Sequence, residues 1–257
     1  MRTDLGLAGA VVLVTGGVRG VGRGISRVFA AHGARVVACA RREPETLPDG
    51  VVFRSCDVRD ADRVAELAQW TAGEFGRLDV VVNNAGGSPF SPAAEGSPRF
   101  HEKVVGLNLL APLLVAQQAN ALMQGQDGGG SIVMISSVSG TRASPGTAAY
   151  GAAKAGLDNL TASLAVEWAP KVRVNALDVG MVRTEQAELH YGSTAGVEAV
   201  GKTVPLGRLA EPEEVGQCAA FLASGLASYV SGATLRVHGG GEVPAFLSAA
   251  DVHREGS

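Results

Sequence analysis

Short runs of apolar residues recur along the chain, each four to six residues long. Runs of this length are typical of buried strands. We therefore expect strands at Val11–Thr15, Arg35–Ala40, Val51–Cys56, Leu78–Asn83, Ser131–Ser136, Val172–Leu177 and Thr234–Val237.

Longer segments between these runs place apolar residues at helical spacing. They cover Gly22–His32, Ala61–Phe75, Phe100–Leu122 and Tyr150–Trp168. Strands and helices thus alternate, and strands that are apolar throughout need cover on both faces. The pattern predicts an α/β fold of the Rossmann type, with a doubly wound parallel sheet and helices on both of its faces.

The alternation is interrupted at residues 184–203, which are punctuated by glycine and helical only in pieces. We interpret this segment as a mobile flap. The glycine-rich stretch Gly125–Gly130 is a predicted surface turn. A chain of 257 residues is within the reach of one hydrophobic core, so we expect one domain over residues 1–257.

Net charge and cysteine usage narrow the classes of partner. A formal net charge of −3 provides no field that would hold a phosphate backbone, so nucleic acid is not expected and a small molecule is. The cysteines Cys39, Cys56 and Cys218 are far apart and odd in number. They indicate reduced thiols in a cytoplasmic protein, without a disulfide or a metal.

The apolar run Ala8–Val14 has the length of a signal-peptide core. It leads directly into a glycine loop that would lose its supporting strand on cleavage, so we interpret it as a strand. No uninterrupted apolar stretch reaches the 18 or more residues of a membrane span, and no membrane partner is expected.

A glycine loop follows the first expected strand and opens the first expected helix. Its glycines Gly16, Gly20 and Gly22 stand where a backbone turns tightly and approaches an anion at a helix N-terminus. Taken alone, the triplet is also compatible with an ordinary strand-to-helix turn.

Three further motifs make the interpretation of the loop more specific. The loop has Thr15 in front and Gly-x-x-x-Gly-x-Gly spacing, Asn83-Asn84-Ala85-Gly86 ends the fourth strand, and Ser137 precedes Tyr150-Gly-Ala-Ala-Lys154. In these motifs the chain resembles the short-chain dehydrogenase/reductase family, in its branch of 3-oxoacyl reductases and hydroxysteroid dehydrogenases. The resemblance extends from Val11 to Gly240 and implies hydride transfer between a nicotinamide and a carbonyl or hydroxyl carbon.

The tip of the second strand bears on the choice of cofactor. An acidic residue there would bind the adenosine ribose diol and repel a 2′-phosphate. Ala40 stands where the family's NAD-binding members have Asp, and Arg41 follows it. With Arg19 in the glycine loop, two guanidiniums could converge on one phosphate, so NADP(H) is favoured over NAD(H). Arg42 and Glu43 are expected in a solvated turn.

The resemblance implies the other cofactor contacts, including adenine contacts from Asp57 and Val58 and carboxamide contacts from Val182 and Thr184. The full expected set is Thr15, Gly16, Arg19, Gly20, Val21, Gly22, Arg41, Asp57, Val58, Asn84, Ala85, Gly86, Tyr150, Lys154, Gly180, Val182 and Thr184.

Tyr150 and Lys154 are four residues apart on a helical segment, so they lie on one face of it. A neighbouring ammonium and an oxidised nicotinamide ring both favour the phenolate, which suits a tyrosine that shuttles a proton. Ser137 would hydrogen-bond the substrate oxygen. The resemblance implies that Lys154 holds the nicotinamide ribose and that Asn108 completes a proton relay.

Each of these residues has a structural alternative when taken singly. Tyr150 could be a core residue, Lys154 a solvated helix charge, Ser137 a turn residue and Asn108 a hydrogen bonder at a helix kink. Their joint occurrence at the family's spacing favours catalysis. Ser136 and Ser139 could compete for the serine role, but the interval to Tyr150 selects Ser137.

The chain departs from the family pattern at two positions. Val179 replaces the family's proline, which frees one backbone dihedral and restores an N–H, so the loop over the carboxamide can sit differently. His238 replaces the more usual Asp, and we expect a structural role for it. The resemblance implies that the flap covers the substrate, so its polar aromatic residues His190 and Tyr191 are candidate substrate contacts.

The resulting hypothesis is an NADP(H)-dependent oxidoreductase for a fairly apolar substrate, such as a 3-oxoacyl thioester or a steroid-like ketone. Alternatives are an NAD-dependent alcohol dehydrogenase, a non-catalytic dinucleotide-binding regulator, and a lyase or epimerase, which usually has a larger C-terminal domain. The resemblance also implies a homotetramer or dimer. Leu157, Leu160 and Leu164 could supply its apolar surface or simply belong to the core.

Overall fold

Seven parallel strands form the sheet in the computed structural model, which describes residues 4–250. Their order is β3-β2-β1-β4-β5-β6-β7, so the direction of growth reverses between β1 and β4. The strands are β1 Val11–Thr15, β2 Arg35–Ala40, β3 Val51–Ser55, β4 Val80–Asn83, β5 Gly130–Ile135, β6 Val172–Val179 and β7 Thr234–Val237. This arrangement confirms the predicted doubly wound parallel sheet. In such a sheet, ligands bind beyond the carboxyl ends of the strands at the switch point.

All seven expected strands are present, and their ends differ from the expected ones by at most two residues. The largest extension is in β6, which continues past Leu177 and pairs Val179 with Val237 of β7. Proline at this position could not donate a backbone hydrogen bond to a ladder. The valine is therefore compatible with a longer strand.

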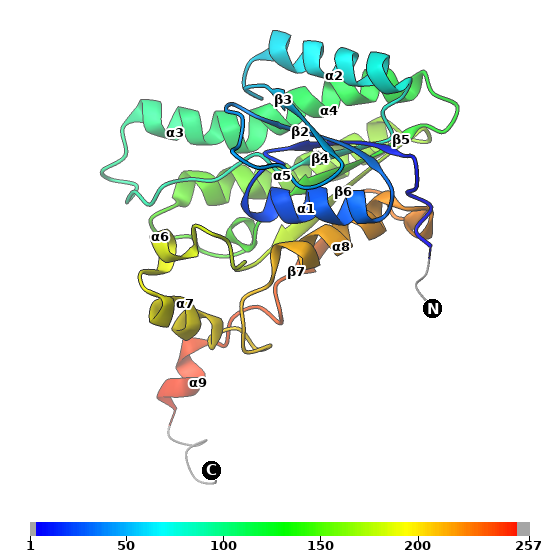
Figure 1. Cartoon of the computed structure of the whole chain (residues 1–257). Helices are drawn as coiled ribbons and strands as arrows, with labels where there is room; N and C mark the ends of the chain where they lie inside the picture. The colour runs from blue at the N-terminus through cyan, green and yellow to red at the C-terminus, as the bar shows by residue number, and fades with distance from the viewer. Residues whose placement is uncertain (1–3, 251–257) are drawn as a thin grey trace.

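Helices flank the sheet on both faces (Figure 1). They are α1 Gly20–Ala31, α2 Ala61–Phe75, α3 Pro98–Val105, α4 Ala111–Gln124, α5 Ala148–Glu167, α6 Ala187–Tyr191, α7 Thr194–Gly201, α8 Pro212–Ala223 and α9 Ala245–Ala249. Short helical turns η1 Gly106–Leu110, η2 Val138–Gly140 and η3 Gly225–Ala227 join some of them. The helix α8 was not among the segments singled out from the sequence.

The strand side chains alternate between two hydrophobic cores. In β1, Val11 and Leu13 pack with α2, α4 and α5, whereas Val12 and Val14 pack with α1 and α8. Both faces of the strand are buried, because helices cover each side. Leu157 and Leu164 belong to the first core and Leu160 packs against it, so within one chain these leucines are core residues.

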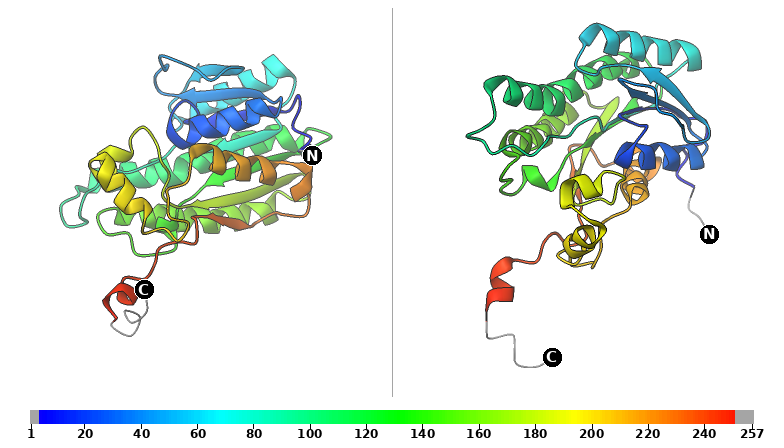
Figure 2. Two further views of the ribbon diagram at one scale, coloured as in Figure 1. Left: turned by 60° about the horizontal axis from the view of Figure 1, so that its bottom comes forward. Right: turned by 60° about the vertical axis from the view of Figure 1, so that its left-hand side comes forward.

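Helices α1 and α8 pack closely where glycines face them. A Cβ at Gly24 would lie 2.4 Å from the Cβ of Pro212, and one at Gly216 would lie 3.0 Å from the Gly24 carbonyl oxygen. Figure 2 shows α1 and α8 side by side on one face of the sheet. This contact fixes the helix that begins at the glycine loop.

The expected helix over Phe100–Leu122 is interrupted. A π-helical turn, η1, separates α3 from α4 and contains Asn108. By length and composition alone, the helical segment Pro98–Gln124 is long and apolar enough to cross a membrane. Its apolar residues are interrupted by scattered polar ones, so it contains no continuous apolar run of that length. One side of α4, including Val115, Ala119 and Met123, is buried in the core.

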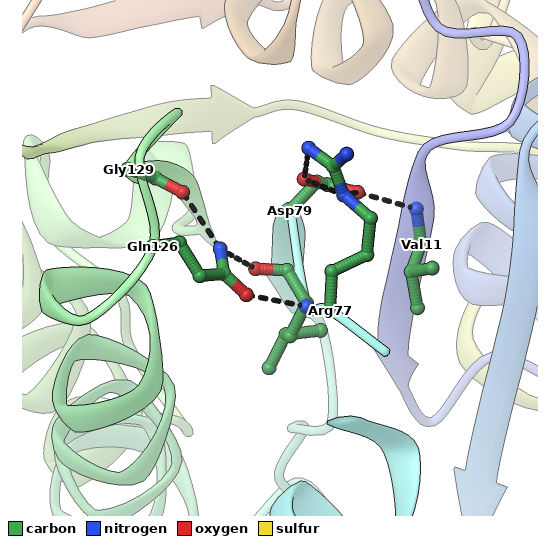
Figure 3. A network of polar contacts seen from close by, with 6 residues as sticks. Val11, Arg77, Asp79, Gln126 and Gly129 are labelled. Carbon is green, nitrogen blue, oxygen red and sulfur yellow. Dashed lines mark hydrogen bonds and ion pairs between the residues drawn. The ribbon is translucent and has the colours of Figure 1, made fainter. Parts of the chain in front are cut away.

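A polar network ties together the amino ends of β1, β4 and β5 (Figure 3). The Asp79 carboxylate accepts a 2.8 Å hydrogen bond from the Val11 backbone N–H and pairs with Arg77. The Gln126 side chain accepts from the Leu78 N–H and donates to the Leu78 and Gly129 carbonyls. The turn at Gly125–Gly130 is thus anchored at the amino ends of the strands, which is the end of the sheet opposite their carboxyl ends.

The segment 184–203 forms two short helices, α6 and α7, in agreement with the expected helical pieces. Gly192, with φ of +87°, ends α6 and separates it from α7. Ala187, Val197 and Leu209 form a small core of their own beneath the flap.

Candidate active site

A groove of about 730 Å³ runs over the carboxyl ends of the strands at the switch point. Its walls come from the glycine loop, the tips of β2, β4, β5 and β6, the start of α5 and the flap. All but Thr15 of the seventeen residues expected to contact the cofactor line this groove.

Glycine is required at two positions of the loop. Gly16 has φ of +63°, and a Cβ at Gly22 would lie 2.1 Å from the Gly16 carbonyl oxygen. Beyond the loop, α1 begins with Arg19 as its N-cap, which provides no side-chain hydrogen bond to the first turn. Backbone N–H groups at such a helix start bind anions. The loop therefore fits the pyrophosphate of a dinucleotide.

Thr15 supports the loop from behind instead of lining the groove. Its buried hydroxyl oxygen accepts hydrogen bonds of 3.0 Å from the backbone N–H groups of Asn84 and Ala85. The Asn84 amide donates to the Thr15 and Gly16 carbonyl oxygens. The motifs after β1 and β4, nearly 70 residues apart in sequence, thus hold each other in place.

At the end of the groove near β2 and β3, basic side chains outnumber acidic ones. Arg19, Arg41, Arg42 and Arg59 line this end, whereas the lining carboxylates among the described residues are Asp57 here and Glu185 in the flap. Arg42 and Glu43 are exposed, as expected for a solvated turn, but Arg42 also borders the groove.

Arg59, which the sequence analysis did not consider, engages Asp57. Its Nε and Nη2 donate to the two carboxylate oxygens of Asp57 over 2.9 and 2.6 Å. These hydrogen bonds hold the pKa of the Asp57 carboxyl below its ordinary value. An adenine contact by Asp57 would have to share the carboxylate with Arg59.

Tyr150 lies in the first turn of α5 at the wall of the groove. Burial raises the pKa of its phenol, a hydrogen bond with the Ser137 hydroxyl lowers it, and the negative charge of Asp178 raises it. Ser137 itself caps η2 and accepts a hydrogen bond from the Ser139 N–H. The structure thus brings the predicted tyrosine and serine together.

Lys154 is one helical turn beyond Tyr150 and is completely buried apart from a small opening to the groove. Its Nζ donates to the Ile135 carbonyl oxygen at 2.6 Å and lies 5.6 Å from the centre of the Tyr150 ring. Burial lowers the pKa of the ammonium to about 8. Ser136 also borders the groove, and its hydroxyl donates to the Lys154 backbone carbonyl.

Asn108 is fully buried in the π-helical turn. Its Oδ1 accepts from the Gly87 N–H at 2.8 Å, and its Nδ2 donates to the carbonyls of Val104 and Gly87. Gly86 lies between it and the lysine, since a Cβ there would be 2.7 Å from Asn108 Oδ1 and 3.5 Å from Lys154 Nζ. The side chain therefore holds the loop that separates it from Lys154.

Residues at the end of the sixth strand and in the flap form the other end of the groove. Gly180, Val182 and Thr184 line it, and Gly180 has no room for a side chain because a Cβ would lie 2.8 Å from the Cβ of His238. His238 therefore lies close against Gly180, directly after β6. Val182 forms an isolated parallel bridge with Ala210, which anchors the root of the flap.

The two candidate substrate residues of the flap have different surroundings. His190 lines the groove. Tyr191 packs in the small core beneath the flap, and burial raises the pKa of its phenol. Only His190 is therefore placed where a ligand in the groove could be reached directly.

Two acidic residues near the site were not singled out from the sequence. Glu185, at the root of the flap, contacts the glycine loop. Asp178 is buried on the α5 side of β6, where its Oδ1 has no hydrogen-bond partner among the described residues. Asp178 directly follows an expected strand, and a position next to a predicted strand does not reveal that its charge acts on a tyrosine 28 residues earlier.

Known proteins match the chain over nearly its whole length. Residues 16–242 match the family model described as enoyl-(acyl carrier protein) reductase. A tropinone reductase homologue of Arabidopsis thaliana is 36% identical, over 97% of this chain and 99% of that protein. D-threitol dehydrogenase of Mycolicibacterium smegmatis is 36% identical, over 92% and 94% respectively.

The fold has solved counterparts as well. The ligand-free aldohexose dehydrogenase of Thermoplasma acidophilum has a TM-score of 0.86 and 30% identity, over 93% of this chain and 96% of that chain. The chain belongs to the short-chain dehydrogenase/reductase family and is an oxidoreductase. The family uses a nicotinamide dinucleotide, which fits the shape of the glycine loop described above.

Proposed function

We propose that the protein is an NADP(H)-dependent oxidoreductase that interconverts a carbonyl group and a secondary alcohol on a fairly apolar small molecule. Tyr150 at the groove wall, with the Ser137 hydroxyl close enough to lower the pKa of its phenol, carries the proposal. Relatives named as reductases and dehydrogenases support the same reaction class.

The residues supply proton transfer and orientation, and the bound nicotinamide would supply or accept the hydride. In reduction, the Tyr150 phenol donates its proton to the carbonyl oxygen. The Ser137 hydroxyl donates a hydrogen bond to that oxygen and stabilises the negative charge that develops there. The Lys154 ammonium favours the phenolate left on Tyr150. In oxidation, the phenolate accepts the proton of the alcohol.

The preference for NADP(H) rests on the charges at the β2 and β3 end of the groove. Arg19, Arg41, Arg42 and Arg59 line this end, and the carboxylate of Asp57, which follows β3, is paired with Arg59. A guanidinium binds phosphate oxygens through charged hydrogen bonds. Ala40 has no carboxylate that would repel a 2′-phosphate.

The apolar substrate is supported by exposed side chains around the catalytic end. Phe90 is 76% exposed and its ring lies beside Gly146, four residues before Tyr150. Leu189 is 82% exposed and neighbours His190 in the flap. We propose a 3-oxoacyl thioester or a steroid-like ketone as the substrate class, acted on by a cytoplasmic homotetramer or dimer.

The substrate part is tested by nicotinamide absorbance with a panel of ketones and alcohols, including 3-oxoacyl thioesters, steroid ketones, polyols and aldohexoses. We expect the apolar ketones to have the highest kcat/KM. Turnover of only the polyols or sugars would contradict the proposed substrate class. Tight cofactor binding without turnover of any compound would favour a non-catalytic regulator.

The cofactor part is tested by replacing Ala40 with Asp and Arg41 with Ser together. Loss of a charged hydrogen bond and gain of like-charge repulsion should weaken NADPH binding by about tenfold to a hundredfold, with a swing towards NADH. Fluorescence titration with both cofactors measures the change. Equal affinities of the wild-type protein for NADPH and NADH would refute the arginine phosphate site.

A further inference from the structure

The carboxylate of Glu185 sits at the N-terminus of α1. The Gly20 backbone N–H donates to its Oε1 over 2.9 Å and to its Oε2 over 3.2 Å. Helix α1 has twelve residues, and its N-cap Arg19 offers no side-chain acceptor to the first turn. Glu185, 165 residues further along the chain, therefore supplies the anion that this helix start lacks locally.

Glu185 also belongs to the flap. It directly follows Thr184, whose side-chain Cγ2 would lie 3.5 Å from a Cβ at Gly20. The carboxylate lines the groove together with Arg19, Gly20 and Val21. None of the ion pairs found within residues 4–250 neutralises Glu185.

A carboxylate and a dinucleotide pyrophosphate would bind to the same backbone N–H groups at this position. Both are anions that accept hydrogen bonds from backbone N–H groups at a helix start. One N–H cannot serve both fully, and two anions held together without a cation between them repel each other. Glu185 and a phosphate group therefore compete for the Gly20 N–H.

We propose that Glu185 is an affinity-determining residue that competes with the cofactor phosphates for the N-terminus of α1. The inference rests on the proposed function, because it assigns the pyrophosphate to the glycine loop. When the cofactor binds, the Glu185 side chain leaves Gly20. When Glu185 returns, it assists release of the cofactor after turnover.

The matched variants are Glu185→Gln, which removes the charge, and Glu185→Ala, which removes the acceptor as well. The control is Glu188→Gln, three residues further along the same flap, where Oε1 accepts a hydrogen bond from the Thr194 hydroxyl. Circular dichroism and gel filtration check that all variants are folded.

Fluorescence titration with NADPH measures the equilibrium, and stopped-flow displacement of NADPH measures its dissociation rate. We expect E185A to bind NADPH about tenfold more tightly than the wild type, mainly through slower dissociation, and E185Q to be intermediate. E188Q should match the wild type. Affinity in E185A that is equal to or weaker than in the wild type would overturn the proposal.

The unfolding temperature is a second readout, because Glu185 stabilises the N-terminus of α1 in the cofactor-free protein. E185A should lower the unfolding temperature of the cofactor-free protein, because α1 loses its anion, whereas the difference should shrink or reverse in saturating NADPH. A lower unfolding temperature that persists unchanged with NADPH would assign Glu185 to stability alone and overturn the competition.

Failure of the proposed function gives a different result. If the wild type, E185Q and E185A all lack affinity for NADPH and NADH, then the cofactor assignment itself is wrong and the competition falls with it. If the wild type binds NADPH and reduces ketones while E185A has unchanged affinity, only the role of Glu185 is wrong.

Discussion

At the scale of single residues, the proton donor is the most direct test of the reaction. We expect Tyr150→Phe to lower kcat by about a hundredfold or more, because proton transfer by a positioned side chain contributes roughly 10²–10⁴ to a rate. The dissociation constant of NADPH should change little, since the phenol acts on the substrate oxygen. Steady-state kinetics measure kcat, and cofactor titration measures the dissociation constant of NADPH. Near wild-type turnover of the variant would rule out Tyr150 as the proton donor.

Asp178 offers a test of how the pKa of Tyr150 is tuned. Its side chain is completely buried, accepts a 3.4 Å hydrogen bond from the Thr141 hydroxyl and lies 3.9 Å from Arg236. Burial raises the pKa of the Asp178 carboxyl, but the carboxyl is ionised at the alkaline pH where a phenol titrates. There its charge raises the pKa of Tyr150.

We expect Asp178→Asn to lower the pKa of the Tyr150 phenol, because a negative charge is removed. Alcohol oxidation needs the phenolate, so its rising pH profile should move to lower pH. Ketone reduction needs the phenol, so its alkaline decline should move the same way. The pH dependence of kcat in both directions measures this. His238, Asp158 and Arg236 also face Asp178 and remain in the variant. An unchanged profile would show that Asp178 is only structural.

The residues predicted from the sequence stand in the family's motifs or share one helix face. Tyr150 and Lys154 are one helical turn apart, so their common face follows from periodicity. Glu185 was missed because its partner, Gly20, is 165 residues away. Arg59 was missed because it stands in no motif, and residues two apart in a loop have no fixed relative direction that would predict its hydrogen bond to Asp57.

At the scale of elements, the strands were predictable because uniformly apolar runs leave few alternatives. The helix α8 was less visible, since its buried face carries Gly216, Ala219 and Ala220 beside Val215. Small residues weaken the apolar periodicity although they allow close packing. In the π-helical turn, the Asn108 side chain bonds to Val104 four residues earlier and to Gly87, 21 residues earlier, and no local pattern reveals the second of these contacts.

Close packing of α1 on α8 leads to a prediction about stability. A Cβ at Gly24 would meet the Cβ of Pro212 at 2.4 Å and the Glu213 nitrogen at 2.8 Å, so the helices would have to separate. We expect Gly24→Ala to lower the free energy of unfolding by about 1–3 kcal/mol. Because α1 begins at the glycine loop, affinity for NADPH should fall as well.

Gly73 in α2 is the matched control, since a Cβ there would have no neighbour within 4 Å. Alanine stabilises a helix interior by about 0.5–1 kcal/mol relative to glycine. Gly73→Ala should therefore be neutral or stabilising in urea denaturation. Equal effects of the two substitutions would contradict the packing argument.

At the scale of the whole molecule, the fold buries a cation beneath the groove, with only a small opening to it. Lys154 is completely buried, and burial lowers the pKa of its ammonium from 10.5 to about 8. Below pH 8 the ammonium is present in the folded and unfolded chains alike, and the folded chain bears the full desolvation cost. Between pH 8 and 10.5 the folded chain binds fewer protons than the unfolded one, so this contribution to stability rises with pH.

The corresponding variant is Lys154→Met, which removes the charge and retains most of the side-chain volume. We expect its free energy of unfolding, relative to the wild type in the absence of cofactor, to fall by about 3 kcal/mol as the pH rises from 8 to 10.5. The hydrogen bond lost at the Ile135 carbonyl shifts the difference at every pH and does not alter its slope. Urea denaturation of both proteins across this pH range measures the slope. A difference independent of pH would mean that Lys154 keeps an ordinary pKa in the folded protein, because water or a counter-charge reaches it.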